Sequence, residues 1–171
     1  MSTHPVFLIV RAKLGEVTKA LAHMNALDVQ QRALRVEHPD LYSPDAHAES
    51  MVTNVQGIYT HFEAILKTLA NTIDGFSPSG EAWHRDLLLQ AAAVGTDRPE
   101  MISPAVLDGM SELLRFRHAV RNNYASSLRH EDVFRNLVTL QRIAPTFLSD
   151  IERLIERFGT TGTSSPPADR G

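Results

Sequence analysis

Six residues between positions 107 and 124 form one stripe whose character changes along its length. They follow one another at steps of three and four, the spacing of side chains on one face of a helix, and are Leu107, Met110, Leu114, Arg117, Arg121 and Tyr124. The first half is an ordinary apolar stripe that faces a core. A buried arginine is costly unless it is paired, so we expect the second half to leave the core and to line a groove, an interface or an anion site.

The sequence around these arginines is a basic island in an acidic chain. Residues 115–135 contain five arginines against two acids, whereas the whole chain has a formal net charge of −3. The planar guanidinium groups of Arg115, Arg117 and Arg121 match phosphate oxygens, which favours a phosphate-binding site. Two plainer interpretations stay open: a solvated helix end that complements the helix dipole, or pairing with acids on a neighbouring helix.

Acid–base chemistry near neutral pH needs a group that titrates there, and His118 is the histidine beside the stripe. It follows Arg117 and points about 100° further round the helix, so it either borders the groove or acts as a base. Asn122 lies one turn beyond His118 and can hydrogen-bond a phosphate or a base, but it cannot titrate. We interpret His84 as a packing or surface histidine and Trp83 as a core anchor.

Metal and cofactor chemistry has no support in the sequence. There is no cysteine, and none of the usual ligand spacings occurs among the other histidines, which are His4, His23, His38, His47, His61, His84 and His130. We therefore expect no metal and no cofactor.

Hydrophobic periodicity predicts helices throughout and no strands. Ser43-Pro44 and Ser103-Pro104 are helix start signals, and Pro145 predicts a kink or break in the last helix. The expected helices are residues 6–35, 44–73, 81–93, 104–125 and 130–158. They predict one all-α domain over residues 1–158, a five-helix up-and-down bundle, followed by a disordered tail of Gly, Thr, Ser and Pro over 159–171.

The composition is that of a globular protein of one domain, with 171 residues, 43% of them hydrophobic and 22% charged. The acidic net charge gives no global attraction to nucleic acid, so an RNA site must be a local basic patch. The apolar run Val6–Val10 is too short for a membrane span or a signal-peptide core. We expect a cytoplasmic protein that does not contact the membrane.

Four segments together resemble the HepT-like branch of the HEPN superfamily, the ribonuclease toxins of two-gene toxin–antitoxin systems. The family pattern has a Trp-His-x-x-Leu-Leu opening, an Arg-Pro, and a Phe-Arg-His run that leads to Arg-x4-His-x-Tyr. The similarity covers about residues 81–140, and its segments are Trp83-His84-Arg85-Asp86-Leu87-Leu88, Arg98-Pro99, Leu114-Arg115-Phe116-Arg117-His118 and Arg121-Asn122-Asn123-Tyr124.

The resemblance implies a HEPN-type bundle that forms a homodimer, in which the Arg-x4-His helices of two subunits form one RNA-cleaving cleft without metal. It also implies a partner nucleotidyltransferase, the antitoxin, which adds AMP to the motif tyrosine. Position by position, Arg117 matches the motif arginine and Tyr124 the motif tyrosine. The motif histidine falls on Asn122.

This departure leaves the activity of the chain open. The protein is a degenerate member, or His118 has taken over the role of base, or the sequence carries an inactivating change to a toxic protein. The sequence thus predicts an RNA-cleaving toxin subunit that is catalytically impaired. The alternative is a HEPN-type protein that binds RNA or a partner without cleavage.

Overall fold

The computed structural model describes residues 5–122 and 128–160 and is helical in both ranges. Its elements are α1 (Pro5–Glu37), α2 (Pro44–Leu69), a π-helical turn η1 (Ala70–Asp74), α3 (Trp83–Ala92), α4 (Pro104–Asn122) and α5 (His130–Thr160). No strand is found in the two described ranges. The predicted all-α five-helix bundle is therefore confirmed.

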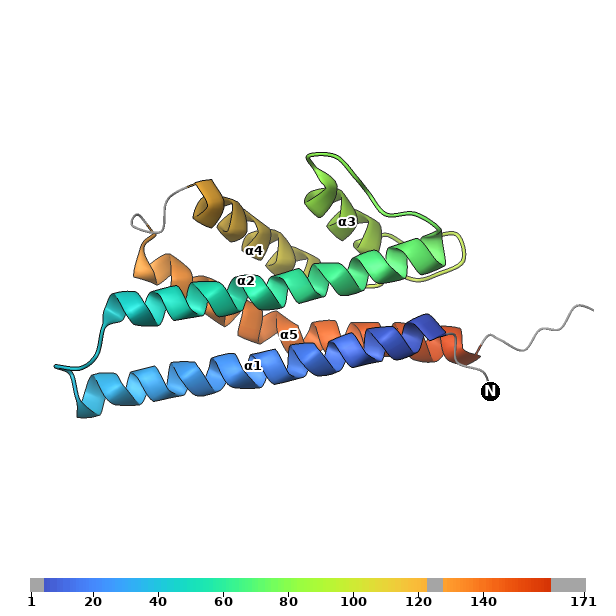
Figure 1. Cartoon of the computed structure of the whole chain (residues 1–171). Coiled ribbons are helices and arrows are strands. Elements are labelled where there is room, and N and C mark those ends of the chain that lie inside the picture. The colour runs from blue at the N-terminus through green and yellow to red at the C-terminus, as the bar shows by residue number, and fades with distance from the viewer. Residues whose placement is uncertain (1–4, 123–127, 161–171) are drawn as a thin grey trace, which may run out of the picture.

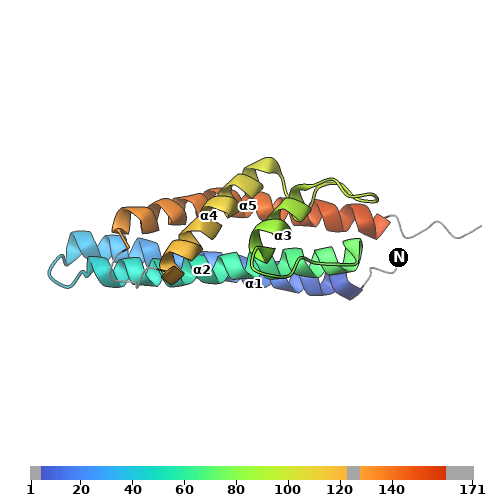
Figure 2. The same ribbon diagram turned by 90° about the horizontal axis from the view of Figure 1, so that it is seen from above.

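The three long helices form an elongated body and the two short helices form a second layer on it. Figure 1 shows α1 and α2 as an antiparallel hairpin with α5 running alongside both, and α3 and α4 on the side of α2 away from α1. Seen from above, α4 and α3 cross the long helices obliquely (Figure 2). The C-terminal end of α4, where the arginines lie, is thus carried across α2.

Local signals fix the turn between α1 and α2. The Ser43 hydroxyl accepts a hydrogen bond from the Ala46 amide at 3.2 Å, the N-cap predicted from Ser43-Pro44. Below it, His47 is 2% exposed and its Nε2 lies 2.9 Å from Asp28 Oδ1, while its Nδ1 lies 3.1 Å from the Tyr42 hydroxyl. Both ring nitrogens therefore have partners, and this series of hydrogen bonds connects α1 with α2.

Close packing sets how α4 and α5 meet α2. The rings of Phe62 and Phe147 stack with centroids 4.0 Å apart between α2 and α5. Gly109 of α4 lies directly against Ile143 of α5, and a Cβ at Gly109 would come within 3.1 Å of the Ile143 Cδ1 and closer still to Cγ2. The missing side chain thus lets α4 lie close to α5.

The break predicted at Pro145 does not occur. Pro145 stands inside α5, which runs without interruption from His130 to Thr160. Proline removes one backbone hydrogen bond from a helix, but Pro145 faces solvent, while its neighbours Ala144 and Phe147 anchor the helix in the core. Burial on the inner face therefore keeps α5 helical through the proline.

The remaining boundaries differ by a few residues. The second helix ends in a π-helical turn to Asp74, after which Gly75 takes a left-handed φ of 78°. The last helix runs to Thr160, two residues past its predicted end. Residues 161–171 of the predicted tail, and residues 123–125 of the predicted fourth helix, lie outside the described residues.

Candidate functional site

The stripe on α4 leaves the core toward its C-terminal end. Met110 is fully buried and Leu114 is 7% exposed, whereas Arg117 is half-buried and Arg121 is exposed. Arg115 and Asn122, the last residue of α4, are also exposed, and Tyr124 lies outside the described residues. The helix thus carries its arginines from the packed interior to the surface within two turns.

Two residues of α2 hold the side chain of Arg117 in place. Its Nη1 donates a hydrogen bond to the Thr60 hydroxyl at 2.9 Å, and its Cζ lies 6.0 Å from the centre of the Tyr59 ring. Its Nε is buried and has no hydrogen-bond partner within the described residues. Its Nη2 also has no hydrogen-bond partner there and, unlike Nε, is not among the buried atoms, so this nitrogen is suited to an incoming anion.

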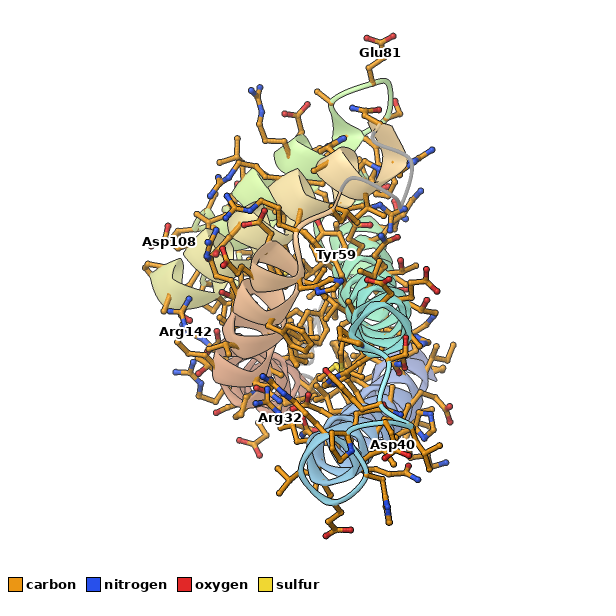
Figure 3. All side chains as sticks on the ribbon, turned by 90° about the vertical axis from the view of Figure 1, so that its left-hand side faces the viewer. Arg32, Asp40, Tyr59, Glu81, Asp108 and Arg142 are labelled. Atoms are coloured by element: carbon orange, nitrogen blue, oxygen red, sulfur yellow. The ribbon has the colours of Figure 1, made fainter. Side chains whose placement is uncertain are left out.

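Tyr59 is the buried floor beneath Arg117. It is 1% exposed, and Figure 3 shows it in the interior of the molecule, between α2 and the helices α4 and α5. Burial, and after it the negative charge of Glu63, raise the pKa of the Tyr59 phenol far above its ordinary range, although Arg117 opposes the shift. The phenol therefore stays neutral and does not form an ion pair with Arg117.

The acids of the basic island pair with its other arginines. Arg129 contacts Glu131 at 2.8 Å and Arg135 contacts Asp132 at 3.0 Å. By contrast, none of the three arginines of α4 makes an ion pair with an acid within residues 5–122 and 128–160; they are Arg115, Arg117 and Arg121. Pairing with a neighbouring helix, one of the plainer interpretations, is thus not seen in the described part of the chain.

A buried carboxylate–imidazole pair lies beside the arginines. Glu63 of α2 is 3% exposed, and its Oε1 lies 2.6 Å from Nδ1 of His84 in α3. The Trp83 ring stacks on His84 at 3.7 Å, with Lys67 Nζ 5.1 Å from its centre. His118 meets His84 edge-on, with ring centroids 6.3 Å apart.

Sequence reasoning missed this pair. His84 was interpreted as a packing or surface histidine, but it is the partner of a buried acid, and Trp83 is half-buried at the rim of the core and not an anchor inside it. One signal was present: Glu63 stands among buried residues such as Tyr59 and Phe62 on the inner face of α2. An acid at a core position points to an unseen partner.

Arg98, from the Arg-Pro segment, has a different role. It is 6% exposed, and its Nε and Nη2 donate to Asp74 at 2.6 and 2.7 Å. It also donates to the carbonyl oxygens of Gln90, Ala93 and Pro99. This arginine holds the α3–α4 loop against the end of η1, and all five of its donor hydrogens have protein partners.

The hollow near the start of α2 lacks the chemistry of an anion site. A hollow of about 650 Å³ between the first turns of α2 and α5 is lined by Asp45 and Glu49, whose carboxylates repel phosphate. No group of three or more His, Asp or Glu side chains in the described ranges is placed to hold a metal ion. Nor does any helix in those ranges have the length and apolarity needed to cross a membrane.

Comparison with known proteins identifies the family. A family model described as HepT-like protein matches residues 50–158. The chain belongs to the HepT-like family. The match runs from α2 to near the end of α5, so it includes Glu63, His84, Arg98 and Arg117, while α1 lies outside it. Neither a curated protein nor a solved structure matches the chain significantly.

The family match confirms the resemblance drawn from the four segments. This HepT-like protein is a member of the HEPN superfamily. Within the family region, the structure brings Arg117, His118 and His84 into one neighbourhood, over α2.

Proposed function

We propose that this HepT-like protein is the RNA-directed toxin subunit of a two-gene toxin–antitoxin pair. Arg117, with Arg115 and Arg121, binds the RNA phosphate, and cleavage proceeds without metal. The observation that carries the proposal is the set of α4 arginines without acid partners in the described residues, the innermost of which is held by Thr60 with donors left unpaired. Family membership supports the same class of function.

Arg117→Ala tests the phosphate site. Each phosphate contact releases counterions, so RNA affinity falls as salt rises. Against single-stranded RNA, we expect Arg117→Ala to bind more weakly and to reduce the slope of log affinity against log salt by about one. Fluorescence anisotropy across a salt series measures both.

Arg135→Ala is the matched control, since it removes the same charge from the same basic island at a residue that already pairs with Asp132. We expect a much smaller loss of RNA affinity for this variant. Equal affinity of wild type and Arg117→Ala at every salt concentration contradicts the proposal.

The second candidate is RNA or partner binding without cleavage, and Asn122 favours it. Asn122 is exposed at the end of α4 and offers hydrogen bonds but no titrating group. The variant Asn122→His restores the motif histidine. A strong gain of RNA cleavage over wild type supports the binding-only interpretation of the natural chain, whereas cleavage by wild type at a comparable rate argues against it.

Further parts of the proposal concern the partners of the protein and its location. The protein forms a homodimer in which two α4 helices share one cleft, so light scattering should give about twice the 19.0 kDa of the chain. Its antitoxin is a nucleotidyltransferase that adds AMP to Tyr124, bringing phosphate charge to the arginines. The cognate transferase with ATP should then add the mass of AMP to Tyr124. Both proteins act in the cytoplasm.

A further inference from the structure

The pairing of Glu63 with His84 is more elaborate than helix packing requires. Removing a carboxylate from water costs several kcal/mol, and a buried ion pair is weak evidence of stabilisation, since apolar residues of similar volume often hold helices equally well. Glu63 is 3% exposed and contacts one imidazole nitrogen at 2.6 Å. The pair therefore points to a role for the imidazole beyond joining α2 and α3.

A second buried pair in the same molecule shows what a structural histidine looks like. His47 uses both ring nitrogens, one on Asp28 and the other on the Tyr42 hydroxyl. His84 uses Nδ1 alone, on Glu63, and its Nε2 has no hydrogen-bond partner in the part of the chain that the structure describes. The carboxylate favours the tautomer that donates from Nδ1, which leaves the Nε2 lone pair available to accept a proton.

The surroundings hold this ring in one orientation. Trp83 stacks on its face with an interplanar angle of 27°, and His118 meets it edge-on at 6.3 Å. Among the titratable groups, Glu63 of α2 and His118 of α4 contact this ring. Lys67 of α2 lies over the neighbouring Trp83 ring, and Tyr59 of α2 lies near the charges of both Glu63 and Arg117. A base, a second imidazole and the guanidinium of the residue before it on α4 therefore share one neighbourhood.

These groups supply what RNA transesterification needs. His84 Nε2 accepts the proton of a ribose 2′-hydroxyl, whose oxygen attacks the adjacent phosphorus. As the P–O5′ bond breaks, protonated His118 gives its proton to the departing 5′-oxygen, and Arg117 faces the charge on the phosphate. The products are a 2′,3′-cyclic phosphate and a 5′-hydroxyl; no metal, oxidant or water is consumed, and Asn122 transfers no proton.

We propose that His84 and His118 are the acid–base pair of an RNA-cleaving site bordered by Arg117, with Glu63 as the positioning residue of His84. The proposal rests on the RNA-directed function proposed above and assigns the proton transfer that Asn122 cannot perform.

The decisive variant is His84→Asn, because the asparagine Nδ2 keeps a donor where Nδ1 contacts Glu63 while the titrating group is lost. Incubated with total cellular RNA, wild type yields fragments with 2′,3′-cyclic phosphate and 5′-hydroxyl ends. We expect the cleavage rate to fall on the order of 10²- to 10⁴-fold in His84→Asn and in His118→Asn. His23→Asn, the same change on the exposed face of α1, keeps the wild-type rate.

Glu63→Gln separates positioning from packing. The amide oxygen still accepts from Nδ1, so folding is retained, but the imidazolium loses its counter-charge. We expect kcat to fall, KM to stay unchanged, and the acidic limb of the pH–rate profile to move to lower pH. A purely structural role leaves that limb where it is in wild type.

Each outcome decides the assignment. Cleavage by wild type that is lost in both histidine variants supports it, and equal cleavage by wild type and His84→Asn overturns it while RNA-directed function stands. RNA binding that depends on Arg117, without cleavage by wild type, overturns the assignment but leaves the binding function. If wild type shows no RNA binding and no RNA cleavage, the proposed function itself is overturned. If His84→Asn fails to fold, His118→Asn decides, because that exposed ring has no polar partner in the described residues.

Discussion

Arg98 and Arg117 both lie in the region that matches the family, yet their surroundings differ in almost every respect. Arg98 is 6% exposed, and its five donor hydrogens meet the Asp74 carboxylate and three backbone carbonyl groups. Arg117 is half-buried, makes one hydrogen bond to a threonine hydroxyl, and has no acid partner in the described residues. Arg98 is thus fully paired within the protein, whereas Arg117 keeps donors for the phosphate contact that we propose.

Replacing Arg98 should cause the largest loss of stability. Arg98→Ala leaves Asp74 and three carbonyl oxygens without their buried partner, which costs about 3–5 kcal/mol of unfolding free energy. Urea denaturation at pH 7 measures it. Arg85→Ala is the control, because Arg85 forms an exposed pair with Asp86 and surface pairs contribute about 0–1 kcal/mol. Similar losses in the two variants would show that the Arg98 network does not hold the loop.

The Arg117 region should weaken the protein at alkaline pH. The pKa of Tyr59 is raised in the folded chain from an ordinary value of 10.0, so above pH 10 the unfolded chain releases a proton that the folded chain retains. The contribution of Tyr59 to the free energy of unfolding is therefore fully present below pH 10, and it falls by about 1.4 kcal/mol per pH unit above that pH. Tyr59→Phe should remove this part of the pH dependence, measured by thermal unfolding from pH 8 to 11. An unchanged slope would contradict it.

The Arg98 region should weaken the protein at the opposite end of the pH scale, by a smaller amount. The hydrogen bonds that Arg98 donates to Asp74 lower the pKa of the Asp74 carboxyl below its ordinary value of 3.8. The stabilisation is therefore present above about pH 4 and is lost as pH falls through the lower folded-state pKa. The difference in stability between wild type and Arg98→Ala should narrow as the pH falls below 4, because only the part that depends on the Asp74 charge is lost. A constant difference between them would contradict this assignment.

Arg117→Ala should change stability least. It removes one hydrogen bond to Thr60 and some contact with Tyr59, worth about 1 kcal/mol or less. The same variant has a large expected effect on RNA affinity, so the ratio of the two effects separates the arginines. A loss of stability as large as that of Arg98→Ala would place Arg117 among the structural residues.

The features that could be predicted from the sequence are those that depend on residues close together in the chain. Steps of three and four residues are enough to find each helix and to show that the α4 stripe leaves the core near Arg117. The contact of Glu63 with His84 spans 21 residues and depends on how α3 lies across α2, for which no local pattern exists. Likewise Pro145 reads as a break until the packing of Phe147 is known.

The π-helical turn at the end of α2 has a consequence for the length of that helix. A π turn holds one residue more than an α turn, so the residues after it are offset in angle from where an α-helix would put them. Removing one residue from 70–74 would rotate Asp74 by about 100° around the axis, away from Arg98. The number of residues between Leu69 and Gly75 therefore determines the angular position of Asp74 around the helix axis. Insertions or deletions there should be tolerated far less than in the loop that follows.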